Sequence, residues 1–576
     1  MSGDTVKRRE FDRQIAGTLH DKPLAGRVLA ARGLQNSDEI LLKSRDLPAP
    51  DAMADFDKAV GLLADAVLNN QLILIVGDYD ADGATSTALA VHVLRACGIN
   101  CQYLVPNRFE YGYGLSAEIV AVALEQKPDL ILTVDNGIAS NDGVAKAVEA
   151  GVTVVVTDHH LPPEVLPEAH AIVNPNRLDC GFTAKNVCGV GVIFYVMTGL
   201  CRRLQKLKWF EKHNRPVPNM ATYLDLVALG TVADVVPLDK TNRILVDQGV
   251  KRIRADATRP GIRALFEVAG RQQSRCMTQD LGFFIAPRLN AAGRLADMTV
   301  GIECLLAEDK NSAVALASEL QQINSQRRSI QAGMNAEAES QIEQLQLSGD
   351  LPPALVLYEP QWHEGVIGIV AGRIKERCHR PVFAFARSTD GTLKGSGRSI
   401  ADVHIRDTLM DIVASSPGIL KKFGGHAMAA GASLAESDLP AFTDAFIECV
   451  SQRLGGTSPQ REWLTDGELD DKELCLENAE LMQFLQPWGQ SFEAPTFDDI
   501  FCIESVRIVG NNHSKMLIRR SNGRSKLPAI AFNRQIDCTR SERWRVVYRL
   551  DVNHYKNDFP AVADRLSGAD LSYCWL

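Results

Sequence analysis

The 576-residue sequence has no uninterrupted apolar run of roughly 18 residues, the length at which a helix can begin to span a bilayer. Its first 30 residues carry charges throughout and lack the apolar core that a secretory signal peptide requires. These absences argue against a membrane protein and against a secreted one. We therefore expect a cytoplasmic protein with no membrane partner.

The spacing of the cysteines also gives no sign of a disulfide framework. Thirteen cysteines are scattered along the chain with no CxxC pair, and their odd number does not suit complete pairing. Reduced thiols in a cytosolic protein are the plain reading. The sequence has no GxSxG segment either, so the nucleophilic serine of the α/β-hydrolases is not expected.

A net positive charge is lacking as well, since the formal charge is −9, which taken alone argues against a nucleic-acid partner. The charges are nevertheless segregated along the chain. Residues 461–500 hold two basic and eleven acidic residues, whereas residues 501–560 hold twelve basic and five acidic ones, a local surplus of seven. This surplus can attract a polyanion, although two differently solvated surfaces would produce the same counts.

The order of sequence patterns indicates an α/β fold with several domains. Short β-branched runs at Leu72–Val76, Leu130–Val134 and Val152–Val156 alternate with helical stretches, as in a parallel sheet buried on both faces. Residues 300–347 read as helical, and a second α/β segment begins at Ala354 and ends near the glycine pair at 455 and 456. Alternating runs between residues 500 and 555 predict a small antiparallel barrel or sheet.

The first candidate site is the segment GDYDADG, which follows the first predicted strand and places Asp78, Asp80 and Asp82 at alternate positions. Three crowded carboxylates repel one another unless cations neutralise them, and Mg²⁺ and Mn²⁺ take such oxygen ligands. In an open parallel sheet, ligands bind just beyond the carboxyl ends of strands. A calcium loop is disfavoured because Leu89 stands where that loop requires a glutamate. A solvated acidic turn is the remaining alternative.

Two further strands end in the same way. TVDNG places Asp135 directly after the second strand, and TDHH places Asp158, His159 and His160 after the third. One aspartate at a strand end is most often a helix cap, but three consecutive strands ending in aspartate are harder to dismiss. Imidazole nitrogen beside carboxylate oxygen favours Mn²⁺ or a similar transition ion.

The fourth acidic segment is LVALGTVADVVPL, in which Asp234 lies in an apolar frame. An unpaired buried charge is costly, and a bound metal would relieve that cost. Asp225 is the competing ligand in this part of the chain. A role for Asp225 at a helix start or in a salt bridge is equally consistent with the sequence.

Together these segments resemble the DHH phosphoesterase family. GDYDADG, VDNG, TDHH and GTVADVVPL stand in the order of its four metal-binding motifs, and PRLNAAGR, GSGRS and GGHAMAAG match further signatures of its bacterial members that degrade single-stranded DNA. The seven motifs extend over about 360 residues, so the resemblance covers most of the chain.

The resemblance implies a metal-dependent site. It makes Asp80, Asp82, Asp135, His159 and Asp234 the direct ligands, with Asp78, Asp158 and His160 as nearby ligands or as groups that orient the others. Such a set implies two ions, Mn²⁺ or Mg²⁺, that share one carboxylate, for which Asp135 is favoured. The predicted reaction is phosphodiester hydrolysis by a water that the metals activate.

The substrate side is predicted from three groups of residues. Ser396 and Arg398 of GSGRS and His426 of GGHAMAAG lie among glycines that allow close approach to phosphate, and the resemblance assigns them to a DHH-associated domain. The other candidates are Arg108, Tyr113, Arg288, Asn290 and Arg294. Packing is as good an interpretation for the tyrosine, and a structural role is the alternative for His426. The basic terminal segment, with Lys515, Arg519, Arg520, Arg524, Lys526, Trp544 and Tyr555, suits an OB-like single-strand-binding domain.

These inferences combine into one hypothesis. The expected domains are a parallel-sheet DHH domain at 1–299, a helical linker at 300–350, a DHH-associated α/β domain at 351–456 and a β-rich OB-like domain at 457–576. The resemblance implies a 5′ to 3′ exonuclease that degrades single-stranded DNA to mononucleotides in recombination and repair, beside single-strand-binding protein and a repair helicase. The alternatives are a DHH phosphodiesterase for very short or cyclic oligonucleotides and a catalytically silent DNA-binding scaffold.

Overall fold

The structure is a computed structural model, and it describes residues 5–107, 114–347, 349–510, 513–520, 526–532, 534–537, 543–552, 561–563 and 573–575. The chain divides into two compact units. One consists of Met1–Lys7 and Asn324–Trp463, and the other of Arg8–Ile323 and Leu464–Leu576. Among the described helices, none has both the length and the apolar character needed to cross a membrane.

A parallel five-stranded sheet organises the larger unit, with the strand order β3-β2-β4-β5-β6. The strands are β2 (Ile73–Gly77), β3 (Cys101–Leu104), β4 (Leu130–Val134), β5 (Thr153–Thr157) and β6 (Ala171–Val173). β2 and β4 are buried along their whole length, as expected for β-branched runs covered on both faces. The three predicted strands are therefore confirmed to within one residue, and so is the mixed α/β fold.

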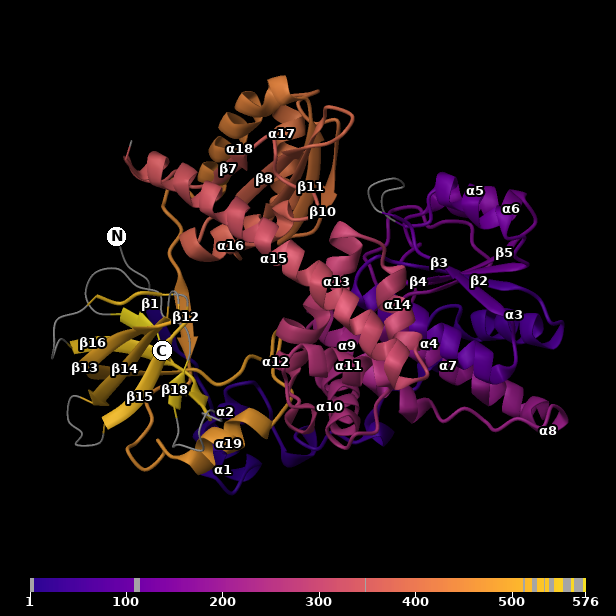
Figure 1. Cartoon of the computed structure of the whole chain (residues 1–576), viewed down its shortest axis with the longest axis horizontal. Coiled ribbons are helices and arrows are strands. Elements are labelled where there is room, and N and C mark those ends of the chain that lie inside the picture. The colour runs from indigo at the N-terminus through magenta and orange to yellow at the C-terminus, as the bar shows by residue number, and fades with distance from the viewer. Residues whose placement is uncertain are drawn as a thin grey trace. The chain divides into compact units, whose positions relative to one another are not determined.

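Helices cover both faces of this sheet. Figure 1 shows α5 (Ala117–Glu125) and α6 (Asn141–Glu149) on one face, where their apolar side chains form a buried cluster with alternate residues of β2, β4 and β5. On the other face lie α3 (Phe56–Leu68), α4 (Ala81–Cys97) and α7 (Gly189–Lys206). The sheet edge at which β2, β4 and β5 end is thus held by packing on both sides.

Further helices of this unit precede and follow the sheet. They are α1 (Arg13–Leu19), α2 (Pro23–Ala30), α8 (Trp209–Lys212), α9 (Leu224–Ala233), α10 (Lys240–Arg254), α11 (Pro260–Val268), α12 (Thr278–Asp280), α13 (Ala286–Leu295) and α14 (Thr299–Leu306). The 38-residue α15 (Lys310–Leu347) then carries the chain from the larger unit into the smaller one. The predicted helical stretch at 300–347 is therefore two helices, α14 and α15, separated near Glu308.

The smaller unit contains the second α/β segment. Its sheet has the order β10-β11-β9-β8-β7, in which only β7 and β8 are paired in parallel. The strands are β7 (Leu355–Tyr358), β8 (Val382–Arg387), β9 (Leu393–Arg398), β10 (Lys422–Gly425) and β11 (Ala429–Leu434). Phe383 and Phe385 of β8 pack edge-to-face against Phe442 of α18 (Leu439–Arg453), beside α17 (Ile405–Ser415), while α16 (Ile367–Cys378) covers the other face (Figure 1).

The terminal segment is β-rich, as its alternating pattern predicted. Its sheet has the order β17-β18-β15-β14-β13-β16-β19 among the described residues. The strands are β13 (Phe497–Val509), β14 (His513–Arg520), β15 (Lys526–Ala531), β16 (Arg543–Tyr548), β17 (Leu550–Asp551), β18 (Ala561–Ala563) and β19 (Tyr573–Trp575). A bulge between Ile503 and Ser505 bends β13, and α19 (Leu476–Phe484) precedes the sheet. Earlier in the chain, β1 (Thr5–Arg8) pairs with β12 (Glu462–Thr465).

Charged residues near the N-terminus bind carboxylates of this terminal segment. Arg8 contacts both oxygens of the buried Asp498, with Nε to Oδ1 at 3.1 Å and Nη2 to Oδ2 at 2.9 Å. Arg32 forms a two-pronged ion pair with the buried Asp466. Arg8 and Arg32 therefore tie the beginning of the larger unit to its terminal segment.

Asp498→Ala is expected to destabilise this structure by about 2 to 3 kcal/mol. Asp498 is fully buried, whereas its partners Arg8 and Arg545 remain 45% and 34% exposed, so the loss should be smaller than for a fully buried pair. Burial opposes ionisation, but the hydrogen bonds from Arg8, Thr465 and Arg545 outweigh it and hold the pKa of Asp498 below its usual 3.8. Its contribution is thus present above about pH 4 and is lost as the pH falls through the lowered pKa.

Thermal unfolding at several pH values measures this contribution. The exposed Glu480→Ala on α19 is the control and should change stability by less than about 0.5 kcal/mol. A difference between wild type and Asp498→Ala that stays constant down to pH 3, or that is absent at pH 7, would contradict the assigned role.

Candidate metal centre

The acidic residues meet because of the strand register. In the parallel sheet Gly77 is level with Val134, and Val134 is level with Thr157, and these residues end β2, β4 and β5. The next residue in each case is an aspartate, so Asp78, Asp135 and Asp158 emerge side by side at one sheet edge. All three are buried.

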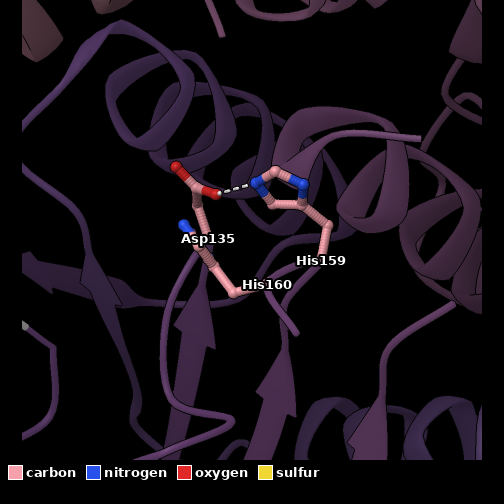
Figure 2. A group of neighbouring side chains, drawn as sticks. All are labelled: Asp135, His159 and His160. Carbon is pink, nitrogen blue, oxygen red and sulfur yellow. Dashed lines mark ion pairs between the residues drawn. The ribbon is translucent and has the colours of Figure 1, made fainter. Parts of the chain in front are cut away.

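Asp135 and His159 lie at the middle of the resulting cluster. Their closest atoms, Asp135 Oδ1 and His159 Nε2, are 3.2 Å apart, and His159 Nε2 is 3.5 Å from Asp234 Oδ2. Figure 2 shows the carboxylate of Asp135 and the ring of His159 turned toward each other, with His160 beside them. Asp135 has a φ of +62°, a left-handed conformation that aspartate tolerates better than most residues and that follows directly after the strand.

Three sets of ligand atoms lie close enough together to hold a cation. Within each set the atoms are all within 4.8 Å of one another, and the sets are Asp135, His159 and His160; Asp82, His159 and Asp234; and Asp78, Asp80 and Asp135. Asp135 and His159 each belong to two sets. The arrangement therefore suits more than one ion, with ligands shared between them.

Asp80 and Asp82 are positioned by helix termini. Oδ1 of Asp80 accepts hydrogen bonds from the N–H groups of Asp82 and Gly83 at 2.9 and 3.0 Å and so caps α4. Asp82, in the first turn of α4, is 1% exposed. Asp234 lies instead at the C-terminus of a helix, as the residue that directly follows α9.

Asp158 orients its neighbours. Its Oδ1 lies 2.7 Å from Nδ1 of His160 and accepts from the backbone N–H groups of His159 and His160, while Oδ2 accepts from the N–H of Ile138 at 2.9 Å. With Nδ1 engaged in this way, the ring of His160 can offer Nε2 to a cation. Asp158 belongs to none of the three ligand sets among the described residues, which matches the orienting role that was one of its two predicted roles.

The buried carboxylates of the cluster repel one another and would be stabilised by positive charge. Burial, followed by repulsion from Asp234 and Asp80, raises the pKa of Asp82 well above its usual value. Burial and the neighbouring aspartates raise the pKa of Asp135 in the same way, and they raise that of Asp234 to about 7. Divalent cations would neutralise this charge, and the mixture of carboxylate oxygen and imidazole nitrogen suits Mn²⁺ or Mg²⁺. The residues present therefore fit such ions.

Asp225 is excluded from the cluster by its partners. It is fully buried, pairs with the guanidinium of Arg259 and accepts a hydrogen bond from Thr258 Oγ1 at 2.7 Å. Of the three roles that the sequence left open, the structure therefore supports the salt bridge, and Asp225 also lies in the first turn of α9. No local pattern could have decided this, because Arg259 lies 34 residues further along the chain.

The predicted substrate residues of the larger unit have mixed positions. Arg108 and Tyr113 lie outside the described residues. Asn290 Oδ1 accepts a hydrogen bond from the N–H of Ala81 at 2.7 Å, so it supports the loop that carries the acidic residues. Arg288 is buried and donates to the carbonyl oxygen of Phe284, while Arg294 is half-buried. Gly293 allows α13 to pack on the same loop, since a Cβ there would lie 1.8 Å from the carbonyl oxygen of Tyr79.

In the smaller unit, Arg398 has the surroundings of an anion-binding group. Its Nη1 donates to Ser396 Oγ at 3.0 Å and to the carbonyl oxygen of Gly397 at 2.8 Å. Burial lowers the pKa of Arg398, and among the described residues it forms no ion pair. A Cβ on Gly368 would lie 3.0 Å from Nη2, so this glycine allows α16 to approach the guanidinium. The exposed His426 lies in the turn before Ala429, which is in register with Arg398.

The charge surplus of the terminal sheet is partly neutralised within the sheet. Glu504 pairs with both Arg519 and Lys526, and Arg520 pairs with Asp471 and Asp499. Lys515 forms no ion pair within the described ranges, Trp544 is half-buried, and Arg524 and Tyr555 lie outside those ranges. Counting charges along the sequence thus overstated the basic surface available to a polyanion.

Comparison with known protein families agrees with this architecture. The chain matches the DHH family N-terminal domain at residues 72–231, the DHHA1 domain at 352–452 and the RecJ OB domain at 465–559. The first match begins at the strand that leads to Asp78, includes Asp135 and His159, and ends at Thr231, three residues before Asp234. The fold and the acidic cluster define a phosphoesterase of the DHH class.

Two curated relatives and two solved structures narrow the family. The chain is 50% identical over 538 residues to the single-stranded-DNA-specific exonuclease RecJ of Dickeya dadantii, covering 92% of this chain and 93% of the relative. It is 47% identical to RecJ of Escherichia coli, covering 96% and 97%. The structure is similar to that of Thermus thermophilus RecJ in complex with Mn²⁺, with a TM-score of 0.79 and 29% identity over 99% of this chain and 80% of that one. For the complex with Mg²⁺ the TM-score is 0.73, with 28% identity over 98% and 78%. The chain belongs to the RecJ family of single-stranded-DNA-specific exonucleases.

Proposed function

We propose that this chain hydrolyses single-stranded DNA from its 5′ end and releases mononucleotides, in recombination and DNA repair. The observation that carries the proposal is the buried cluster at the ends of β2, β4 and β5, in which three sets of ligand atoms share Asp135 and His159. Membership of the RecJ family supports the choice of single-stranded DNA over short or cyclic oligonucleotides.

The positions of the side chains support the proposed ligand roles. Asp80, Asp82, Asp135, His159 and Asp234 would hold two divalent ions, with Asp78 as a further ligand. When bound, Mn²⁺ or Mg²⁺ supplies Lewis-acid polarisation of the phosphate and activation of the attacking water. Asp158 fixes the ring of His160, and Asn290 and Gly293 keep the loop after β2 in place. This chain's residues therefore gather the negative charge at one point and hold it rigidly before substrate arrives.

The substrate would be held by residues outside the acidic cluster. Arg398, which is largely buried and forms no ion pair among the described residues, is the strongest candidate for a phosphate contact, with Ser396 and His426 near it. Arg108, Tyr113, Arg288 and Arg294 are proposed to contact the strand near the acidic cluster. The division into domains at 1–299, 300–350, 351–456 and 457–576 is part of this proposal, with the last domain binding the strand further along.

The setting of the reaction is proposed on family grounds. Single-strand-binding protein and a repair helicase are the expected protein partners, because degradation of one strand requires that strand to be exposed. A cytoplasmic location suits chromosomal DNA as substrate. The described cysteines are free thiols, which is compatible with a reducing compartment.

Blocking one end of the strand tests the polarity. With Mn²⁺ present, a single strand carrying a bulky group at its 3′ end should be degraded, and the same strand blocked at its 5′ end should resist. A matched duplex with blunt ends should also resist, and chelation of the metal should stop degradation of every substrate. Labelled products separated by length show the direction and the size of the products.

Each outcome decides a part of the proposal. Degradation that persists with the 5′ block and stops with the 3′ block would reverse the polarity. Equal degradation of both blocked strands would indicate internal cleavage. Activity confined to dinucleotides and cyclic dinucleotides would favour the short-substrate alternative, and binding without cleavage in Mn²⁺ would favour the silent scaffold.

A further inference from the structure

The N-terminus of α7 contacts the acidic cluster. The N–H of Gly189 donates to Oδ2 of Asp82 at 2.7 Å, and the N–H of Val190 donates to Oδ1 at 3.0 Å. All of these groups are buried. The residue that precedes the helix, Cys188, makes no side-chain cap, so Asp82 caps an 18-residue helix from more than a hundred residues earlier in the chain.

Gly189 also lies against the second central carboxylate. A Cβ at this position would be 2.5 Å from Oδ1 of Asp135 and 2.6 Å from its Cβ and Cγ. Such distances are well inside ordinary contact, and Asp135 has a constrained left-handed backbone immediately after β4. Only glycine therefore leaves the volume that the carboxyl group of Asp135 occupies.

A second glycine also lies close against Asp82. A Cβ at Gly230 of α9 would lie 2.7 Å from Oδ1 of Asp82 and 2.3 Å from Oγ1 of Thr85. Asp82 thus contacts both the N–H groups of α7 and the backbone of α9 at close range. Both oxygens are fixed by donors on one side, so the rotation of the carboxylate plane is determined by α7.

We propose that the first turn of α7, Gly189 with Val190, is the positioning element of the metal centre. Its two N–H groups set the orientation of the Asp82 carboxylate, and the missing side chain at 189 leaves the space for Asp135. The positive end of the helix dipole stabilises the negative charge there. The inference rests on the proposed function in that it assumes a metal centre at these aspartates, but it assigns a role to residues outside every predicted ligand segment.

Gly189→Ala tests the proposal, and Gly199→Ala on the same helix is the matched control. A Cβ at 199 would lie 2.7 Å from Cζ of Phe56 and 2.8 Å from Cγ2 of Val60, so it strains packing between α7 and α3 by a similar amount without touching the cluster. Both variants should lower the thermal midpoint. Only Gly189→Ala should weaken Mn²⁺ binding, by about tenfold or more, as for other losses of groups that orient ligands.

Mn²⁺ titration followed by electron paramagnetic resonance gives the dissociation constant without any need for activity. A Gly189→Ala constant within twofold of wild type would overturn the proposal. An equal loss in Gly199→Ala would also overturn it, because general displacement of α7 would then be sufficient.

A second variant keeps the test open if Gly189→Ala does not fold. Val190→Pro removes one donor to Asp82, and proline is tolerated in the first turn of a helix, here after a glycine with no Cβ to clash with the ring. It should weaken Mn²⁺ binding by about tenfold, and unchanged binding would overturn the role of the N–H groups. Asp135→Ala separates the two proposals. If it binds Mn²⁺ like wild type, the metal centre itself is wrong, whereas a defective Asp135→Ala beside a normal Gly189→Ala removes only the positioning role.

Discussion

Asp135→Ala is expected to reduce hydrolysis of single-stranded DNA by at least about a thousandfold while the strand is still bound. Asp135 contributes to two of the three sets of ligand atoms, so its loss should weaken the binding of an ion at either of those two sets. Lewis-acid stabilisation of a phosphoryl transition state is worth several kcal/mol, and each 1.4 kcal/mol is a factor of about ten. The residues proposed to hold the strand are elsewhere in the chain and remain unchanged.

Single-turnover cleavage and fluorescence anisotropy with labelled DNA measure the two effects separately. The exposed Asp142→Ala on α6 removes the same group a few residues away and should behave as wild type. Asp135→Asn keeps the shape of the side chain and tests the charge alone. Cleavage by either Asp135 variant within tenfold of wild type, with the fold confirmed by circular dichroism, would exclude Asp135 as a shared ligand.

The Asp135→Asn variant should also change the thermal stability of the protein. Burial and mutual repulsion raise the pKa values of Asp82, Asp135 and Asp234, which means that the ionised cluster destabilises the metal-free protein. Asp135→Asn should therefore raise the thermal midpoint in chelator and should lose most of the increase that Mn²⁺ gives wild type. A structural carboxylate would behave in the opposite way in both respects.

The acidic cluster could be predicted from the sequence because the position of each aspartate depends on the strand that directly precedes it. A buried strand in a parallel sheet has a continuous apolar pattern, and the residue after it emerges at a known edge. Asp78, Asp135 and Asp158 could therefore be placed together from the amino-acid pattern alone. The second α/β segment and the β-rich terminal segment could be predicted for the same reason, because their periodicities depend on neighbours a few residues apart.

What could not be predicted depends on partners far apart in the chain. Arg259, which pairs with Asp225, decided between the ligand role and the salt bridge for that residue. The capping of α7 by Asp82 likewise depends on two residues that are 107 positions apart in the chain. In the terminal sheet, the pairing of Glu504 with Arg519 and Lys526 follows from strand register and bulge, which charge counting does not reveal. The count of basic residues was correct, but ion pairs across the sheet neutralise part of the positive charge that it implied.

The same dependence on distant partners affects how the terminal segment can be tested. Deleting it would leave Arg8 and Arg32 without Asp498 and Asp466, and it would leave Arg243 without the ring of Phe492, which lies 4.2 Å from its guanidinium carbon. A truncated chain would then lose stability whether or not the segment binds DNA. Point substitutions that keep these pairs, such as Lys515→Ala, are the better test of its contribution to strand binding.

Arg398→Ala is expected to impair degradation of strands that carry a 5′ phosphate by between about tenfold and about a hundredfold. A charged hydrogen bond is worth about 1.5 to 3 kcal/mol, and the guanidinium forms no ion pair among the described residues that the loss would break. Mn²⁺ binding should be unchanged, because none of the three ligand sets includes a residue of this segment. Arg398→Lys keeps the charge without the planar fork and should give an intermediate loss.

Comparing 5′-phosphorylated and 5′-hydroxyl strands identifies the group that Arg398 holds. If it binds the terminal phosphate, removing either partner should cost about as much as removing both, so wild type prefers the phosphorylated strand and Arg398→Ala does not. If it binds the chain beside the end, the two losses should multiply instead. The exposed Arg406→Ala on α17 controls for a general loss of positive charge in the same unit and should leave the preference intact. An Arg398→Ala protein with normal rates on both strands would remove Arg398 from the site, because a largely buried guanidinium that contacts phosphate cannot be lost without effect.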